Sequence, residues 1–270
     1  MGRTLLIAAL AVLLVLNFTA YGDRAGEAYF DQALKSAAAT FAVARVLNGI
    51  ISVIQHVEVA AAPAGVGLSA APGQVLDPLN DLVEQFSTVM LMATVSLAMQ
   101  KLLLSFSGWW VAKVVIAVPL ALLLLWLLVG DRGVFGARQR GLLARVVLML
   151  LLVRFALPFV AVASGAVERV FLNEPIQTKT EALVRIEQSA VELMPADEEE
   201  TDRKWHESLL AGGKSMLQLR ENAKLLQEKI AGAIGTIVDL IALFIIQTVL
   251  LPIGFLYIAI KGVKALWRTA

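Results

Sequence analysis

The sequence contains no cysteine and only two histidines among its 270 residues. Without cysteine the chain has no disulfide bond, no thiolate nucleophile and no zinc site built on sulfur. The histidines, His56 and His206, are far apart in the sequence, and neither has a second histidine at helical spacing. We therefore expect no metal, no cofactor and no enzymatic activity.

A surplus of charge is also missing, because 23 basic residues stand against 22 acidic ones and the formal net charge is +1. Nucleic-acid-binding proteins carry a clear basic surplus, so we expect no nucleic-acid partner. Apolar residues are abundant instead: 59% of the chain is hydrophobic, against about 45–50% in typical soluble domains. The composition predicts an all-α integral membrane protein in contact with the lipid bilayer.

The apolar residues gather in blocks of about 20, the length that crosses about 30 Å of hydrocarbon. Four blocks predict four transmembrane helices: residues 5–20, 109–129, 142–164 and 234–260. The first block follows Arg3 and is also compatible with a secretory signal peptide. Its last residues fit a cleavage site poorly, so we interpret it as an uncleaved anchor. Trp109 and Trp110 open the second block, as an interfacial aromatic belt would.

Basic residues mark the short connections and therefore the cytoplasmic side. They lie at the N-terminus, in the 130–141 loop and in the C-terminal tail: Arg3, Arg132, Arg138, Arg140, Lys261, Lys264 and Arg268. Asp131 is the only acidic residue of that loop. The pattern predicts cytoplasmic termini, a cytoplasmic middle loop and two long extracytoplasmic connections. The abundance of Ala, Leu and Val in the chain favours a bacterial inner membrane.

This topology divides the chain into five parts. They are transmembrane helix 1 at 1–21, extracytoplasmic helices at 22–108 with an Ala/Gly/Pro connector at 60–76, transmembrane helices 2 and 3 at 109–165, an extracytoplasmic helical hairpin at 166–231, and transmembrane helix 4 with its tail at 232–270. Two weaker apolar stretches, 37–55 and 89–107, leave six spans as an alternative. We favour neither crossing, because a central charge such as Arg45 costs about 2.5–3.5 kcal/mol on insertion.

The extracytoplasmic parts show helical spacing. A predicted buried face repeats every three or four residues: Ala33, Ala37, Phe41, Ala44, Leu47, Ile51 and Ile54. Pro78 after Asp77 predicts a helix start. Thr178 and Glu181 have capping-box spacing and predict the start of a coiled-coil-like hairpin. The acidic run 197–202 would form the tip of that hairpin.

The candidate functional residues lie inside the predicted spans. Arg154, Asp239 and Gln247 are polar residues where hydrocarbon makes polarity expensive, so they should face other helices or water. We predict an ion pair between Arg154 and Asp239, joining transmembrane helices 3 and 4, with Gln247 as an additional intramembrane polar residue. Lys113 and Arg145 lie nearer the ends of their spans and can extend to the interface, so no role is assigned to them.

Two classes of function remain open at this point. The first is a non-enzymatic membrane scaffold or assembly protein, which acts through its hairpin and through association with its own copies or with another membrane or extracytoplasmic protein. The alternative is an oligomeric channel or transporter that uses the buried charges of helices 3 and 4. A membrane enzyme is third, because no segment holds a convergent set of acid, base or metal-binding groups.

Overall fold

The computed structural model describes six stretches of the chain: residues 2–19, 21–60, 73–129, 137–192, 224–225 and 228–269. All secondary-structure elements in these stretches are helical, which confirms the predicted all-α class. Within these stretches five helices are long and apolar enough to cross a membrane, and Arg3–Phe18 is a shorter apolar helix. Both weaker stretches, 37–55 and 89–107, belong largely to helices of the longer group.

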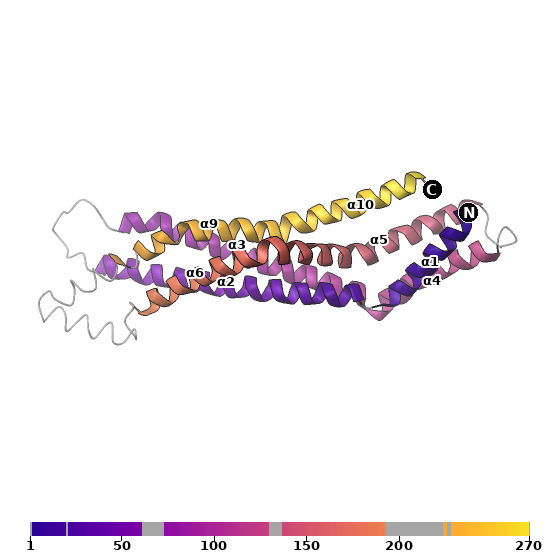
Figure 1. Ribbon diagram of the computed structural model, residues 1–270. Coiled ribbons are helices and arrows are strands. Elements are labelled where there is room, and N and C mark those ends of the chain that lie inside the picture. The colour runs from indigo at the N-terminus through magenta and orange to yellow at the C-terminus, as the bar shows by residue number, and fades with distance from the viewer. Residues whose placement is uncertain are drawn as a thin grey trace, which may run out of the picture. The chain divides into compact units, whose positions relative to one another are not determined.

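The chain forms two compact units. Unit 1 contains residues 1–34, 95–170 and 246–270, and unit 2 contains residues 35–94 and 171–245. The helices of unit 1 are α1 (Gly2–Phe18), the start of α2 (Tyr21–Ala60), the end of α3 (Gly73–Gly108), α4 (Trp110–Val129), α5 (Ala137–Val167), most of the π-helix η2 (Glu168–Leu172), the π-helix η3 (Ile246–Leu250) and α10 (Leu251–Thr269). Figure 1 shows these elements along the chain.

Within unit 1, α1 and α4 lie side by side in opposite directions (Figure 1). Arg3, at the start of α1, donates to the carbonyl of Leu127 at 3.0 Å through Nε. Asn17, at the end of α1, donates to the carbonyl of Lys113 at 2.9 Å. These two bonds fix the register of the pair at both of its ends.

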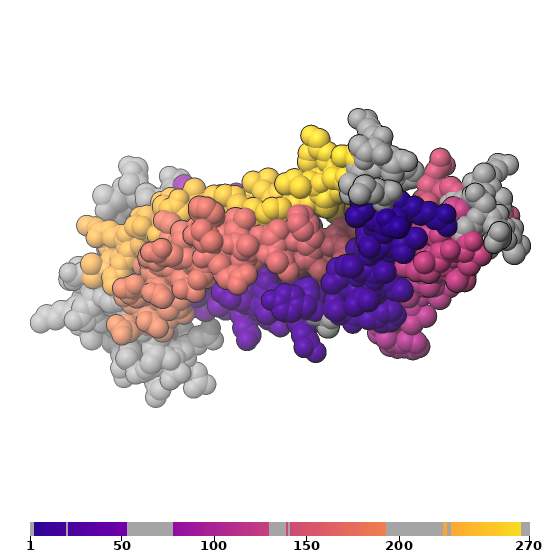
Figure 2. All heavy atoms as spheres, turned by 45° about the vertical axis from the view of Figure 1, so that its right-hand side comes forward, coloured from indigo at the N-terminus to yellow at the C-terminus, as the bar shows by residue number. Residues whose placement is uncertain are grey.

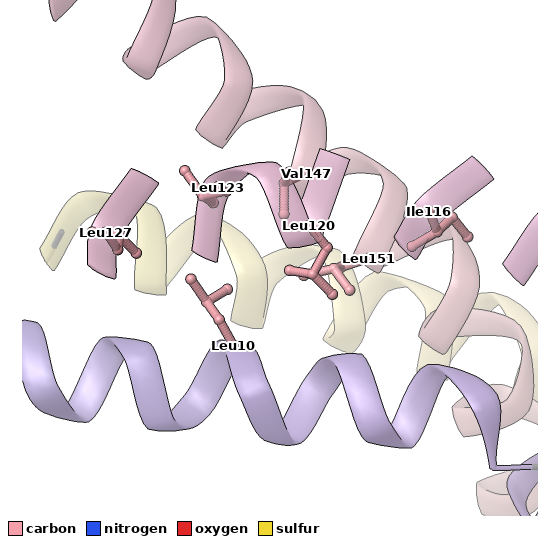
Figure 3. Close-up of a cluster of buried hydrophobic side chains, with 7 residues drawn as sticks. All are labelled: Leu10, Ile116, Leu120, Leu123, Leu127, Val147 and Leu151. Carbon is pink, nitrogen blue, oxygen red and sulfur yellow. The ribbon is translucent and has the colours of Figure 1, made fainter. Parts of the chain in front are cut away.

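An apolar core joins α1 and α4 to α5. Leu10 points from α1 towards Leu120 of α4 and Leu151 of α5 (Figure 3). The other members of this cluster come from α4 and α5: Ile116, Leu123, Leu127 and Val147. Their spacing of three or four residues places them on one face of each helix, while the opposite faces keep large apolar side chains exposed. Exposed apolar faces suit a lipid environment.

The start of α2 continues in the direction of α1, although α1 ends at Phe18 and α2 begins at Tyr21. The carbonyl of Asn17 in α1 accepts from Arg154 of α5 at 3.5 Å. Further along both chains, Gly26 of α2 lies directly against Ala161 of α5. Because the residue numbers rise together along both partners, α1 and α2 follow α5 as two pieces of one interrupted rod.

The end of α3 and α4 form a second interrupted rod, broken at residue 109 and running the opposite way. Leu104 of α3 lies against Gly26, and Ser107 donates to the carbonyl of Arg154. Lys113 of α4 then meets the end of α1. Residue numbers therefore rise along α3 and α4 where they fall along α2 and α1, so the two rods are antiparallel.

The last rod of unit 1 is η3 with α10, which packs along α5. Phe255 and Phe159 meet edge to face with their ring centroids 6.2 Å apart, and Gln247 lies beside Glu168. This order makes α10 antiparallel to α5. Figure 2 shows α10 in yellow alongside α5 in salmon.

Unit 2 contains the remainder of α2 and α3 together with α6 (Asn173–Glu192) and α9 (Ile234–Ile245). Hydroxyl oxygens of Thr40 and Thr180, 3.2 Å apart, join α2 to α6. The expected face of α2 is confirmed, because most of its members are buried: Ala33, Ala37, Ala44, Leu47 and Ile51. Leu183 and Ala190 form the corresponding face of α6.

Two predicted helix starts are wrong. The helix expected from Thr178 begins earlier, because the chain is helical without a break from Ala137 through η2 to Glu192. Ile176 and Leu183, both buried, carry that helix past the capping sequence. Likewise α3 begins at Gly73, so Pro78 lies inside it. The predicted hairpin tip at 197–202 and most of the return arm lie outside the described residues.

Candidate functional site

A buried ion pair between Arg154 and Asp23 forms the main polar site of unit 1. Both terminal nitrogens of the guanidinium donate to the carboxylate, Nη1 to Oδ1 and Nη2 to Oδ2, each at 2.7 Å. The side chain of Arg154 is 2% exposed and that of Asp23 is 9% exposed. The two-point geometry is the strongest form of such a pair, and it fixes orientation as well as distance.

Two further side chains and one backbone carbonyl complete the site from other helices. Lys113 of α4 brings a second positive charge to the site, with its ammonium nitrogen 3.6 Å from the Asp23 carboxylate. Ser107 of α3 lies 3.4 Å from Nη1 of Arg154, and Asn17 of α1 supplies its carbonyl to Nη2. Residues from α1 to α5 therefore meet at one point, and the carboxylate is shared between two positive charges.

The breaks in the rods explain why polar groups gather here. A helix end leaves carbonyl groups without intrahelical partners, and the end of α1 offers the Asn17 carbonyl to Arg154. Asp23 lies in the first turn of α2, where the helix dipole favours a negative charge. Gly108 ends α3 beside Asp23, and a β-carbon there would lie 3.4 Å from its carboxylate oxygen. The site thus uses both helix junctions.

Close helix packing surrounds the pair. An added β-carbon at Gly26 would lie 2.8 Å from Leu104 and 2.9 Å from Ala161. Gly22 and Gly26 form a G-x-x-x-G sequence, the pattern that lets membrane helices approach closely. Gly22 correspondingly faces Pro158 of α5, where an added β-carbon would lie at 3.4 Å. Glycine is needed at Gly26 so that α2 can lie against α3 and α5 together.

The structure gives the two charges of the predicted pair different partners. Arg154 is buried as predicted, but its carboxylate comes from Asp23 and not from Asp239. Asp239 in α9 accepts from Lys179 of α6. That second pair is at the surface, with side chains 34% and 54% exposed. The choice of Asp239 rested on its place within an apolar block, and the structure corrects it.

Sequence reasoning also missed Asp23 and Lys113. Asp23 was counted with the first outer segment, and Lys113 was interpreted as extending to the interface. Two signals pointed to Asp23: it is the first acidic residue after the first apolar block, and it lies between Gly22 and Gly26 of the close-packing sequence. A buried arginine needs a counter-charge, which can come from any helix that it contacts. The prediction considered only carboxylates within the apolar blocks and therefore missed Asp23.

Gln247 belongs to a second buried polar cluster in unit 1. It lies beside Tyr29 of α2 and Glu168 of η2, and Ser164 of α5 also lies beside Tyr29. These neighbours are close, but their geometry is not that of hydrogen bonds. The hydroxyls of Tyr29 and Ser164 and both amide atoms of Gln247 are buried without an aligned partner. At the ion-pair site, Nε of Arg154 and Oδ1 of Asn17 are the corresponding atoms, while the terminal nitrogens of Arg154 are engaged.

The chemistry of the two clusters differs accordingly. The terminal nitrogens of Arg154 and both carboxylate oxygens of Asp23 are engaged with each other, which suits a latch between helices. No group of three or more His, Asp or Glu residues that could hold a metal ion occurs among the described residues.

Comparison with known protein families, curated proteins and solved structures gave no match. The fold is that of a multi-pass α-helical membrane protein.

Proposed function

We propose that this protein is a four-span, non-enzymatic scaffold or assembly component of a bacterial inner membrane, acting through association with further copies of itself. The observation that carries the proposal is an exposed apolar face on α3, in the part that belongs to unit 1. Its members share one side of the helix and are each about half exposed or more: Val95, Met99, Leu102, Leu103 and Phe106.

The helix directions in unit 1 support four crossings over six. Successive crossings require the chain to reverse direction between them. The chain keeps its direction from α1 into α2 and from α3 into α4, so each rod supplies one crossing. The starts of α1 and α5 and the ends of α4 and α10 then share one side. That side carries the basic residues of the termini and the 130–141 loop, and it is cytoplasmic by the charge rule.

On this topology the α3 face lies near the outer end of the spans, since Leu104 packs on Gly26 together with Ala161 of the 142–164 span. Five large apolar side chains of this kind expose on the order of several hundred Å², the size at which an apolar patch marks a contact with protein or membrane. A second copy of the chain offers the same face, and matching faces are the usual basis of two-fold association. The Arg154–Asp23 pair binds at two points, so it holds the surrounding helices in fixed positions and supports the α3 face.

A channel or transporter remains the second candidate, and one observation favours it. The Tyr29–Ser164–Glu168–Gln247 cluster combines buried polar groups without partners and a buried carboxylate. Such groups are expensive in a membrane protein and commonly mark ion pathways. Planar-bilayer recordings distinguish this candidate, because a scaffold gives no cation conductance and a channel does.

Absence of native cysteine makes the topology directly testable by labelling. Gly133→Cys in the middle loop and Glu199→Cys in the acidic run provide one thiol each. In intact cells a membrane-impermeant maleimide should label Glu199→Cys only, and Gly133→Cys should react only after lysis. The opposite pattern would invert the orientation and contradict the proposal. Labelling of both in intact cells would contradict four spans.

Association is tested with a second pair of variants. Leu102→Cys lies in the α3 face, and Ala28→Cys is an exposed position on α2 outside that face. Mild oxidation in membranes should cross-link Leu102→Cys to a dimer and leave Ala28→Cys monomeric. Light scattering in detergent should give at least two chains per particle. A monomer in detergent without cross-linking at Leu102→Cys would refute self-association.

A further inference from the structure

The second polar cluster contains oxygen-bearing side chains from three different rods. Tyr29 comes from α2, Ser164 and Glu168 from the α5–η2 rod, and Gln247 from η3. Their burial is nearly complete: Gln247 is 0% exposed, Ser164 1%, Glu168 4% and Tyr29 7%. Burying polar atoms without partners is costly, and a ligand that contacts several of them at once would offset that cost.

The backbone at this point departs from regular helix. Glu168 lies in η2 and Gln247 in η3, and both are π-helical turns. Such turns are rare, and they occur frequently at functional sites. A side chain of α3 is already used here, because Gln100 donates to the carbonyl of Thr248 at 3.1 Å. The wider turn of η3 is therefore held in place from outside its own helix.

Close packing brings the Tyr29 ring to the cluster. A β-carbon at Gly165 would lie 3.1 Å from that ring, so a glycine is what allows Tyr29 to lie against α5. Arg169, the nearest basic residue in sequence, is exposed and donates through Nε to the carbonyl of Gly165 at 3.1 Å. Among the described residues no basic side chain forms an ion pair with Glu168, and Arg169 acts on its carboxylate only through a longer-range electrostatic attraction.

We propose that Tyr29, Ser164, Glu168 and Gln247 form a binding site for one monovalent metal cation of the size of Na⁺. They offer four oxygen-bearing groups of three kinds: a carboxylate, an amide carbonyl and two hydroxyls. Hard cations prefer oxygen ligands. One carboxylate supplies a single negative charge, whereas calcium sites typically use several. Zinc prefers nitrogen and sulfur ligands, and the cluster contains neither histidine nor cysteine. The inference does not rest on self-association.

The test uses the full-length protein in detergent. Its thermal unfolding is followed by circular dichroism in sodium chloride and in choline chloride at equal ionic strength. A ligand that binds only the folded state raises the unfolding temperature in a saturable way, so sodium should raise it by several degrees over choline. Binding of radioactive ²²Na⁺ to the wild-type protein should saturate at one ion per chain.

Three variants assign the effect to the cluster. Glu168→Gln and Gln247→Leu should each abolish the sodium-dependent rise, whereas Tyr29→Phe should weaken the binding of ²²Na⁺ without abolishing it. Glu174→Gln is the matched control, because Glu174 is exposed on α6 and loses the same charge. It should keep the full effect.

Each alternative result overturns the proposal. Wild-type protein that binds no ²²Na⁺ refutes it even where the variants fail to fold. A stabilisation that depends on acidity and not on sodium would show that the carboxyl group of Glu168 holds a proton. Sodium binding that survives in Glu168→Gln would place the ion elsewhere.

Discussion

Replacing Asp23 by asparagine should destabilise the protein strongly while changing its shape very little. The substitution removes the carboxylate that both terminal nitrogens of Arg154 hold at 2.7 Å. Arg154 stays buried, at 2% exposure, with a positive charge and no counter-charge. Two unit charges about 4 Å apart attract by about 4 kcal/mol at an effective dielectric constant of 20. Removing one partner of a buried pair typically costs about 3–5 kcal/mol.

The same chain provides a matched control on the same helix. Asp31 also pairs with a lysine, Lys101, but its side chain is 51% exposed. Exposed pairs contribute at most about 1 kcal/mol, so Asp31→Asn should have a small effect. The contrast between the two variants isolates burial, because the chemical change is identical.

Thermal unfolding in detergent measures the difference. Intrinsic fluorescence is a convenient signal, since Trp109 and Trp110 lie at the junction of α3 and α4. For a chain of this size 1 kcal/mol shifts the midpoint by about 2–4 °C, so Asp23→Asn should unfold about 6–20 °C below wild type. Equal midpoints for Asp23→Asn and Asp31→Asn would refute the reasoning. Adding Arg154→Met should recover part of the loss, because it removes the unpaired charge.

Two further substitutions test the packing and the surface pair with the same assay. Gly26→Ala should destabilise by about 1–3 kcal/mol through overpacking, because its β-carbon would lie 2.9 Å from that of Ala161. Gly49 lies in the same helix, and an added β-carbon there meets nothing within 4 Å, so Gly49→Ala should be neutral or stabilise by up to about 1 kcal/mol. A larger loss of stability in Gly49→Ala than in Gly26→Ala would contradict the close approach at Gly26. Lys179→Met, which breaks the exposed pair with Asp239, should cost less than about 1 kcal/mol, and a loss as large as that of Asp23→Asn would show that this pair is buried.

The helices and their buried faces follow from the sequence more directly than the contacts between them. Ala37, Leu47 and Ile51 recur at helical spacing and are buried, because a long helix must cover one face wherever its partners lie. Arg154 is predictable for a related reason: a charge within an apolar block must turn inwards. Both inferences need only the periodicity of one helix.

The partner of Arg154 depends on which helices meet, and the sequence does not contain that information locally. Asp23 is 131 residues away from Arg154 in the chain. The π-helical turns at Glu168 and Gln247 are equally hidden, because they leave the apolar pattern on either side unchanged. The start predicted at Thr178 failed for the opposite reason. A local capping signal is worth about 1 kcal/mol, less than the burial of residues such as Ile176 and Leu183 on either side.

The shared carboxylate also has a consequence for how the chain is made. Asp23 leaves the ribosome 131 residues before Arg154, a delay on the order of ten seconds at ordinary rates of translation. Lys113 is synthesised in between and lies 3.6 Å from the same carboxylate in the finished fold. Lys113 is therefore available as a counter-ion for Asp23 before Arg154 has been made.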